Sequence, residues 1–483
     1  MRISTKHQNM QNLFIDDFSG GLNLAAPEEN IANNEFSELT NFEYNPVNGG
    51  LKTADGLLNV YTSAQTIDSL FYDEVNDKFV YHNTELNYVF NTDLTDTAFV
   101  GILSGLDAPM YCKFGDEVAI ASGGVLQIYD GTSLTDVEYL DTVSELGGNL
   151  IATIVTERAG RLVIANNQTD ILYYSGIGDP YSWNFAGETQ DDAKWLQVGY
   201  KDGGYIVGIV PLSSDLLVFK SNGKVFRVIN EYPDWVVVEL SRNSDCVNKF
   251  SCIQVMNDAY FLGPAGGLKA VSTVQEYGAM NQWDAGYKIN PVLLGEVDIN
   301  ASLYYIPLRK QVWIVYNNTG YVYLWSTLTK AFTKRMMVSR PTGIVNDQGY
   351  VYISRDTNIF RISPDTNKDN GVEQVCTIRH KKFTSLNSFL VKRIVIGMNN
   401  INCSTDATYI MGRFSVKLPP GGNGEVVNED LDIVITDIDP INTNNFMITS
   451  CRLNYRVDKI DGKIVSDQGI RTPIYIKYLV VEV

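Results

Sequence analysis

The stretch Leu216-Leu217-Val218-Phe219, followed by Ser221-Asn222-Gly223 and then by Val225-Phe226-Arg227-Val228-Ile229, contains the pattern that decides the fold. Two short apolar runs flank a turn of residues that suit tight connections, Asn and Gly because they tolerate a positive φ angle. This arrangement predicts a β-hairpin. A single hairpin cannot bury its hydrophobic face alone, so we expect it to pack against others.

The same pattern recurs along the chain at a spacing of about 35–55 residues, without a fixed sequence signature. A structural repeat of this length predicts blades arranged radially, as in a β-propeller of about six or seven blades. A chain of β-sandwich modules is the alternative interpretation. The other pairs of runs are Phe79–His82 with Tyr88–Phe90, Glu117–Ile120 with Leu126–Tyr129, Arg161–Ala165 with Ile171–Ser175, Ala259–Leu262 with Leu268–Val271, Val312–Tyr316 with Tyr321–Trp325, and Tyr350–Ile353 with Ile359–Ile362.

The two flanks of this repeat region differ from it, and we therefore predict three domains. Residues 1–60 are predicted to form an N-terminal arm with a short helix over Ala32–Phe42, because Ile31, Phe36 and Leu39 could share one face. Residues 61–363 are predicted to form the propeller-like domain. Residues 364–483 follow a polar linker and are predicted to form a β-sandwich, with longer strands at Phe389–Ile396, Leu431–Ile435 and Ile474–Val483. The predicted fold class is all-β throughout.

Composition supports a globular, strand-rich protein with an acidic surface. The chain has 483 residues, of which 45% are hydrophobic and 19% charged, with 28 Tyr, 39 Gly and a formal net charge of -18. A protein that grips DNA neutralises phosphates with clustered Lys and Arg, and this chain lacks that surplus. The short basic runs Lys334-Arg335 and His380-Lys381-Lys382 are interpreted as solvated faces. We find neither the apolar region of a signal peptide nor a membrane-spanning segment, which predicts a soluble protein.

Each group of residues in the sequence that could carry chemistry has a simpler structural interpretation, so we predict no catalytic, cofactor-binding or metal-binding residues and no enzyme activity. Cys112, Cys246, Cys252, Cys376, Cys403 and Cys451 lack the spacing of a zinc site and are predicted to be reduced and mostly buried. The three histidines, His7, His82 and His380, are far apart in sequence, and no G-x-S-x-G motif supplies a nucleophile. The glycine-rich stretch Gly263–Lys269 lacks the ending of a phosphate-binding loop and predicts a hairpin turn. Alternating carboxylates could bind a hard cation, but solvated acids are the simpler interpretation: Asp430, Asp432, Asp437 and Asp439.

Three groups of residues form an ordered set of motifs. The first group is Asp17-Phe18-Ser19-Gly20-Gly21-Leu22-Asn23 with Ile31, Asn34-Glu35, Leu39, Asn41-Phe42 and the turn Gly49-Gly50-Leu51…Asp55-Gly56. The second is Arg161–Ala165 with Leu172-Tyr173-Tyr174-Ser175-Gly176 and Gly178-Asp179-Pro180-Tyr181-Ser182-Trp183. The third is Leu217–Phe226 with Phe261-Leu262-Gly263 and Gly266-Gly267-Leu268. Through the order of these motifs over residues 17–270, the chain resembles a family of bacteriophage proteins, the tail nozzle and hub proteins (tail tubular protein B-like) of short-tailed phages.

The resemblance implies a structural virion protein made in the host bacterial cytoplasm and located in the phage tail. Such proteins form a homohexameric ring below the portal and adaptor, extend the DNA channel and carry fibres or spikes. Double-stranded DNA would pass through the lumen without specific binding, and the acidic net charge is compatible with this. A head-completion plug that stabilises packaged DNA is an alternative within the phage class. A glycan-binding or glycosidase-type propeller is the alternative from another class, and it predicts a pocket with paired carboxylates and exposed aromatics near the blade axis.

Overall fold

The protein forms two compact units in the computed structural model. The model describes residues 13–45, 49–95, 97–137, 150–187, 189–212, 215–242, 244–263, 265, 267–273, 280–316, 320–347, 349–366, 368–400, 411–417, 428–434, 446–465 and 474–482. The larger unit comprises residues 59–320 and 339–361, and the smaller one comprises residues 1–58, 321–338 and 362–483. The chain therefore changes unit close to the predicted boundaries at 60/61 and 363/364, while residues 321–338 join the smaller unit.

Seven groups of antiparallel strands make up the larger unit. The first five groups have four strands each: β7 Ser69–Asp73, β8 Lys78–His82, β9 Leu86–Phe90 and β10 Thr97–Gly101; β11 Met110–Phe114, β12 Glu117–Ala121, β13 Gln127–Tyr129 and β14 Leu134–Asp136; β15 Ile154–Arg158, β16 Arg161–Ala165, β17 Ile171–Tyr174 and β18 Lys194–Gln197; β19 Ile206–Pro211, β20 Asp215–Lys220, β21 Val225–Ile229 and β22 Val236–Ser241; β23 Cys252–Val255, β24 Asp258–Gly263, β25 Gly267–Thr273 and β26 Met280–Trp283. The sixth group contributes β27 Ser302–Ile306 and β28 Gln311–Val315 to this unit. The seventh consists of β31 Gly343–Asn346, β32 Val351–Arg355 and β33 Asn358–Ser363, beside β6 Gly56–Thr62.

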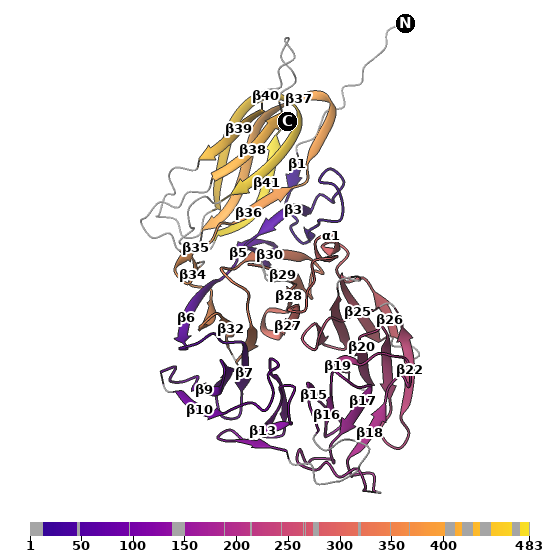
Figure 1. Ribbon diagram of the computed structural model, residues 1–483. Helices are drawn as coiled ribbons and strands as arrows, with labels where there is room; N and C mark the ends of the chain where they lie inside the picture. Colours follow the sequence, from indigo (N-terminus) through magenta and orange to yellow (C-terminus); the bar gives the residue numbers. More distant parts are fainter. Residues whose placement is uncertain are drawn as a thin grey trace. The chain divides into compact units, whose positions relative to one another are not determined.

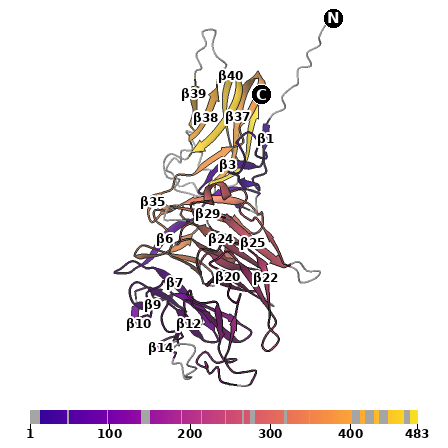
Figure 2. The same cartoon turned by 45° about the vertical axis from the view of Figure 1, so that its right-hand side comes forward.

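The first strands of the seven groups form a closed ring, so the unit is a seven-bladed β-propeller. Strand β31 lies against β7, β27 against β31, and each of β11, β15, β19 and β23 against the first strand of the following blade. Blades 1 and 2 meet where the Ser69 and Tyr111 hydroxyls lie 2.7 Å apart. In Figures 1 and 2 the first strands lie towards the middle of this unit and fourth strands such as β10 and β22 at its periphery. The predicted all-β propeller-like fold is confirmed.

The hairpins predicted from the sequence are the second and third strands of the blades. Six of the seven predicted pairs are antiparallel neighbours, namely β8–β9, β12–β13, β16–β17, β20–β21, β24–β25 and β32–β33. The remaining pair of runs consists of β28 and β29, and its turn at residues 317–319 lies outside the described residues. Central strands of a blade are buried on both faces. Their sequences are therefore continuous apolar runs, which are easy to recognise.

Hydrophobic cores fill the spaces between adjacent blades. Phe219 of blade 4 and Phe261 of blade 5 pack with ring centroids 4.9 Å apart, within a cluster that includes Val210 and Cys252. Equivalent clusters lie between blades 7 and 1, 1 and 2, 2 and 3, and 3 and 4. The sheets of blades 1 to 4 thus bury both faces against their neighbours, as a single hairpin could not.

The smaller unit is all-β as well, and its C-terminal part consists of long antiparallel strands that belong to one hydrogen-bonded sheet. The β-sandwich expected for residues 364–483 stays a prediction. Two long strands, β37 Phe383–Asn400 and β40 Phe446–Val465, pair with each other; β37 also pairs with β41 Ile474–Glu482, and β40 with β36 Thr377–His380 and β38 Met411–Lys417. These strands run from orange to yellow in Figure 1. The remaining strands of this unit are β1 Leu13–Ile15, β2 Gly21–Leu22, β3 Glu35–Thr40, β4 Phe42–Asn45, β5 Gly50–Thr53, β29 Tyr321–Ser326, β30 Phe332–Met336, β34 Lys368–Asp369, β35 Val372–Glu373 and β39 Asn428–Val434.

The helix predicted over Ala32–Phe42 is wrong, because residues 35–40 form strand β3. This strand pairs antiparallel with β36 and parallel with β2, so long-range partners satisfy its backbone groups. A register shift lies between Phe36 and Glu38. Such a bulge interrupts the two-residue alternation of a strand, so Phe36 and Leu39 are both buried although they lie three residues apart. That spacing imitated the apolar face of a helix.

Helical structure is limited, among the described residues, to α1 Asn290–Leu293 and the 3-10 turn η1 Pro307–Arg309. Within that same part of the chain, no helix is long and apolar enough to cross a membrane.

Candidate functional site

The N-terminal motif is an interlocked framework around β2 and β3. The Asn34 side chain donates to Asp17 (2.9 Å), and the Asn23 side chain donates to Glu35 (2.7 Å). The Phe18 and Phe36 rings stack with centroids 5.8 Å apart. The motif residues thus bind one another, and they have a structural role that needs no ligand.

The two glycines of this motif are required by close backbone approach. A Cβ atom on Gly20 would lie 2.5 Å from the Asn34 carbonyl oxygen. Gly21 has a φ of +64°, and its Cβ would lie 2.6 Å from the Phe332 carbonyl oxygen. Only glycine meets both demands at Gly21, since a side chain there would be strained and would also clash.

In the second motif, Arg161 stabilises blade 3 through hydrogen bonds. Its guanidinium group donates to the backbone carbonyls of Ser175 (2.5 Å), Asp192 (2.8 Å) and Gln190. The segment Gly178–Trp183 forms a turn in which the Trp183 indole donates to the Pro180 carbonyl (2.8 Å), and Trp183 itself is buried. Arginine suits this role because its planar group carries five donors in a fixed geometry.

The third motif forms the facing hairpins of blades 4 and 5. Phe219 and Phe261 supply the core between them, and Lys220 is completely buried in an ion pair with Asp202 (2.5 Å). The glycine-rich stretch Gly263–Lys269 is the β24–β25 hairpin turn, as predicted, with Gly263 paired to Gly267. Pro264 and Gly266 of this turn lie outside the described residues.

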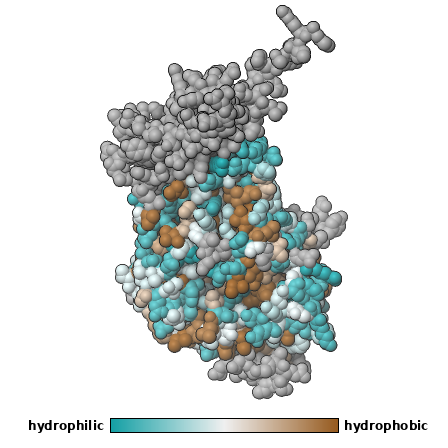
Figure 3. Space-filling model, turned by 45° about the horizontal axis from the view of Figure 1, so that its top comes forward, coloured by the Kyte–Doolittle hydropathy of each residue, from teal (hydrophilic) through white to brown (hydrophobic). Residues whose placement is uncertain are grey.

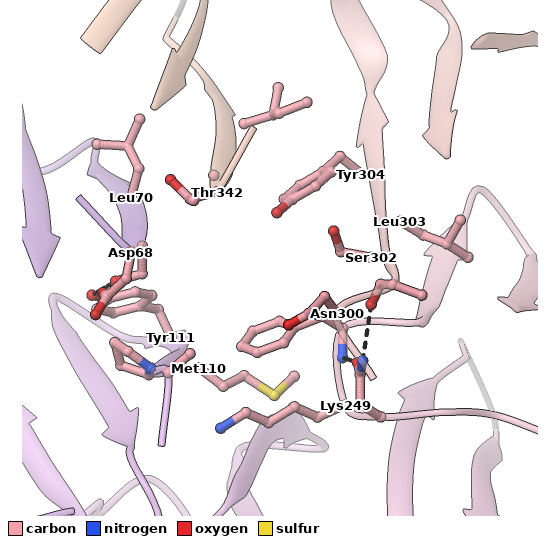
Figure 4. A pocket seen from close by; sticks show the side chains of 18 of the residues that line it. Asp68, Leu70, Met110, Tyr111, Lys249, Asn300, Ser302, Leu303, Tyr304 and Thr342 are labelled. Atoms are coloured by element: carbon pink, nitrogen blue, oxygen red, sulfur yellow. Dashed lines mark hydrogen bonds between the residues drawn. The ribbon is translucent and has the colours of Figure 1, made fainter. Parts of the chain in front are cut away.

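The best candidate for a binding site is a cavity of about 560 Å³ in the centre of the propeller unit. It is lined by residues at the beginnings of β7, β11, β23, β27 and β31, which are first strands of blades 1, 2, 5, 6 and 7. In Figure 4 the side chains of Tyr304, Ser302 and Thr342 point into this space, and Leu70 and Met110 form part of its wall. No single sequence motif marks this site, because its residues come from five separate blades.

Lys249, which lines this cavity, forms hydrogen bonds with two other blades. Its ammonium group donates to the Thr153 carbonyl (2.9 Å) and the Ala121 carbonyl (3.4 Å), so one side chain from blade 5 reaches backbone groups of blades 2 and 3. The side chain is 8% exposed. Burial lowers the pKa of Lys249 to about 8, although the nearby Asp107 carboxylate acts in the opposite direction.

Asp68 is the one carboxylate among the described residues that line the cavity, and it lies 2.8 Å from His82 Nδ1. A glycosidase of the two-carboxylate type needs a second carboxyl group across the scissile bond. The cavity does not bring such a pair together, so the geometry expected for a glycosidase propeller is not found at this place.

The other sequence candidates have mainly structural surroundings. His380 is buried with its Nδ1 near the Lys381 carbonyl, and His7 lies outside the described residues. Cys246 and Cys252 are free, buried thiols, and a hydrogen bond between them, together with burial, raises the pKa of Cys252. Cys112 is also a free thiol, and the buried Cys376 thiol donates to the Asn41 carbonyl (3.5 Å). Cys403 lies outside the described residues, and only the backbone of Cys451 is described. Asp430 and Asp432 are positions of β39, while Asp437 and Asp439 lie outside the described residues. In the part of the chain that the structure describes, no group of three or more His, Cys, Asp or Glu residues could hold a metal ion.

The interpretation of the basic runs as solvated faces is wrong for Arg335. This arginine is fully buried, and it donates to the Asp55 carbonyl at 2.6 Å within the smaller unit. Lys334 stacks over the Tyr321 ring at 3.6 Å, and Lys382 pairs with Glu29 at 2.7 Å. These charged side chains interact with residues that are distant in the sequence, and the local sequence does not reveal such partners.

Comparisons with known proteins found similarity only to solved structures. No protein-family model matches the chain, and no curated protein matches it. Among solved structures, the chain is similar to the β-propeller domain of Cps50 (Swd1) from Myceliophteria thermophila, with 8% identity and a TM-score of 0.42 over 65% of this chain and 100% of that chain. It is also similar to YCF48 from Cyanidioschyzon merolae, with 12% identity and a TM-score of 0.40 over 65% of this chain and 99% of that one. A third similar structure is BBS1N in complex with ARL6DN, with 12% identity and a TM-score of 0.40 over 64% and 98% of the two chains.

Proposed function

We propose that this protein is a structural component of a bacteriophage tail that assembles with copies of itself into a ring, extends the DNA channel below the portal and adaptor, and has no enzyme activity. The observation that carries the proposal is the shared order of the three motif groups between residues 17 and 270. Residues of all three groups stabilise the fold, through the Asp17–Asn34 hydrogen bond, the hydrogen bonds of Arg161 and the packing of Phe219 against Phe261. Motifs that stabilise the fold are expected in a family whose members share that fold.

Charge and surface are compatible with this role. A net charge of -18 disfavours binding to DNA phosphates, so DNA could slide past such a protein without adhering to it. The surface also offers apolar contacts: Phe99, Ile102 and Leu106 are 57%, 67% and 105% exposed. Apolar groups interrupt the hydrophilic surface in Figure 3. Large exposed apolar side chains are typical of contacts between subunits.

The proposal is tested by light scattering on the purified protein, alone and mixed with the portal–adaptor complex of its phage. We expect either a closed ring or a monomer that the complex recruits in about six copies, the symmetry that the family resemblance suggests. A correctly folded protein that stays monomeric and does not bind the complex would contradict the proposal. In that case a screen of glycan binding would test the propeller alternative.

A further inference from the structure

The central cavity has the size and lining of a small-molecule site. Its volume of about 560 Å³ lies within the range of about 300–1,000 Å³ typical of ligand pockets. Such pockets have mainly apolar walls with a few convergent polar groups. Here Leu70, Met110, Leu303 and Ile344 contribute apolar wall, and the rim residue Ile299 is 81% exposed.

The polar groups that converge on the cavity can donate hydrogen bonds to an anion. Tyr304 and Ser302 lie two residues apart on β27 and point into the space together (Figure 4). Arg340 lines the same cavity, and its charge acts on Tyr304. Burial raises the pKa of Tyr304, and its hydroxyl therefore keeps its proton at neutral pH.

Among the described residues that line the cavity, Arg340 is the cation that has a hydrogen-bond donor without an acceptor. Lys249 already donates to two carbonyl groups, and Asp68 is engaged by His82. Arg340 donates through Nη2 to the Asn300 carbonyl, whereas its Nε is buried without a hydrogen-bond acceptor among the described residues. A buried donor of a charged group without an acceptor is costly, and an anionic ligand would satisfy it.

We propose that this cavity binds a small organic carboxylate with an apolar body. The carboxylate would accept hydrogen bonds from Arg340 and from the Tyr304 hydroxyl, and the apolar body would contact Leu70, Met110 and Leu303. The walls favour an apolar chain over a polyhydroxylated ligand, because most of the exposed surface of the cavity is apolar. This binding site goes beyond the proposed tail function and does not depend on it.

The test compares three probes of equal chain length, octanoate, octanol and octylamine, by titration calorimetry on the full-length protein. We expect octanoate to bind and the other two to bind at least about tenfold more weakly, because only octanoate can accept charge-assisted hydrogen bonds from Arg340. Arg340→Gln and Tyr304→Phe should each weaken octanoate binding and leave octanol binding unchanged. Arg242→Gln is the matched control, since that arginine is a surface residue with 78% of its side chain exposed.

Three results would overturn the proposal: no binding of octanoate at millimolar concentration, equal binding of octanoate and octanol, or unchanged octanoate binding in Arg340→Gln and Tyr304→Phe. If Arg340→Gln fails to fold, Tyr304→Phe decides, because it removes only one oxygen. Light scattering on the same samples measures assembly separately, so loss of the ligand site and loss of the ring can be distinguished.

Discussion

At the residue scale, the buried Lys249 makes the stability of the propeller depend on pH. Its pKa of about 8 in the folded protein lies below the ordinary lysine value of 10.5. Between these two values the unfolded chain binds more protons than the folded one, so the free energy of unfolding rises with pH. From pH 7.5 to 9.5 we expect this group to contribute an increase of roughly 2 kcal/mol.

The comparison of wild type with Lys249→Met, by denaturant unfolding at several pH values, checks this expectation. The variant should lose the pH-dependent increase, because the titrating group is gone. Lys201→Met is the control, since Lys201 is exposed and stacks on Tyr200 at the surface. An identical pH slope in wild type and Lys249→Met would contradict the assignment.

Gly21 and Gly49 form a second matched pair at this scale. Both have a positive φ, but a Cβ on Gly21 would meet the Phe332 carbonyl oxygen at 2.6 Å, whereas a Cβ on Gly49 would have nothing within 4 Å. Gly49→Ala should lower the free energy of unfolding by about 1 kcal/mol, because only the positive φ angle disfavours alanine there. Gly21→Ala should cost about 2 kcal/mol more, because it adds a clash inside the N-terminal motif. Thermal unfolding followed by circular dichroism measures the difference, and equal costs would show that packing at Gly21 is unimportant.

At the scale of elements, Arg161 joins β16 to the segment that precedes β18. Replacing it by methionine leaves the carbonyls of Ser175, Gln190 and Asp192 without this donor, and we expect a loss of about 3 kcal/mol. Hydrogen exchange should accelerate around residues 189–197 and not in blade 5. Arg161→Lys should restore little, because an ammonium group cannot reproduce the planar fork. Full rescue by lysine would mean that charge alone matters at this position.

Strand β3 shows how far element-level prediction reaches. Its local sequence contains Phe36 and Leu39 at a helical spacing, yet its pairing partner β36 begins at Thr377, far away in sequence. The propensity of a short segment is a weak signal that tertiary pairing overrides. The blade hairpins were predictable for the opposite reason, because their partners are joined by a short turn.

At the scale of the whole molecule, the exposed apolar side chains of residues 99–106 test the proposed assembly. Ile102→Glu combined with Leu106→Glu places two charges on this surface, and we expect at least a tenfold loss of self-association or of recruitment by the portal–adaptor complex. Val75→Glu is the control, because Val75 is 50% exposed in the β7–β8 turn. Light scattering measures both. Unchanged assembly in the double variant would exclude this surface as a subunit contact.

The all-β class and the hairpins follow from the sequence alone, since they depend on contacts between neighbours such as β20 and β21, which a four-residue turn connects. The closure of the repeat, in contrast, depends on tertiary contacts: β6 completes the seventh blade beside β33, and the Asn59 side chain donates a hydrogen bond to Asn358. The tertiary structure also decided the burial of Arg335 and the meeting of Lys249, Tyr304 and Arg340 at the central cavity. These features join residues that are distant in the chain, and hydrophobic periodicity carries no information about which distant partners meet.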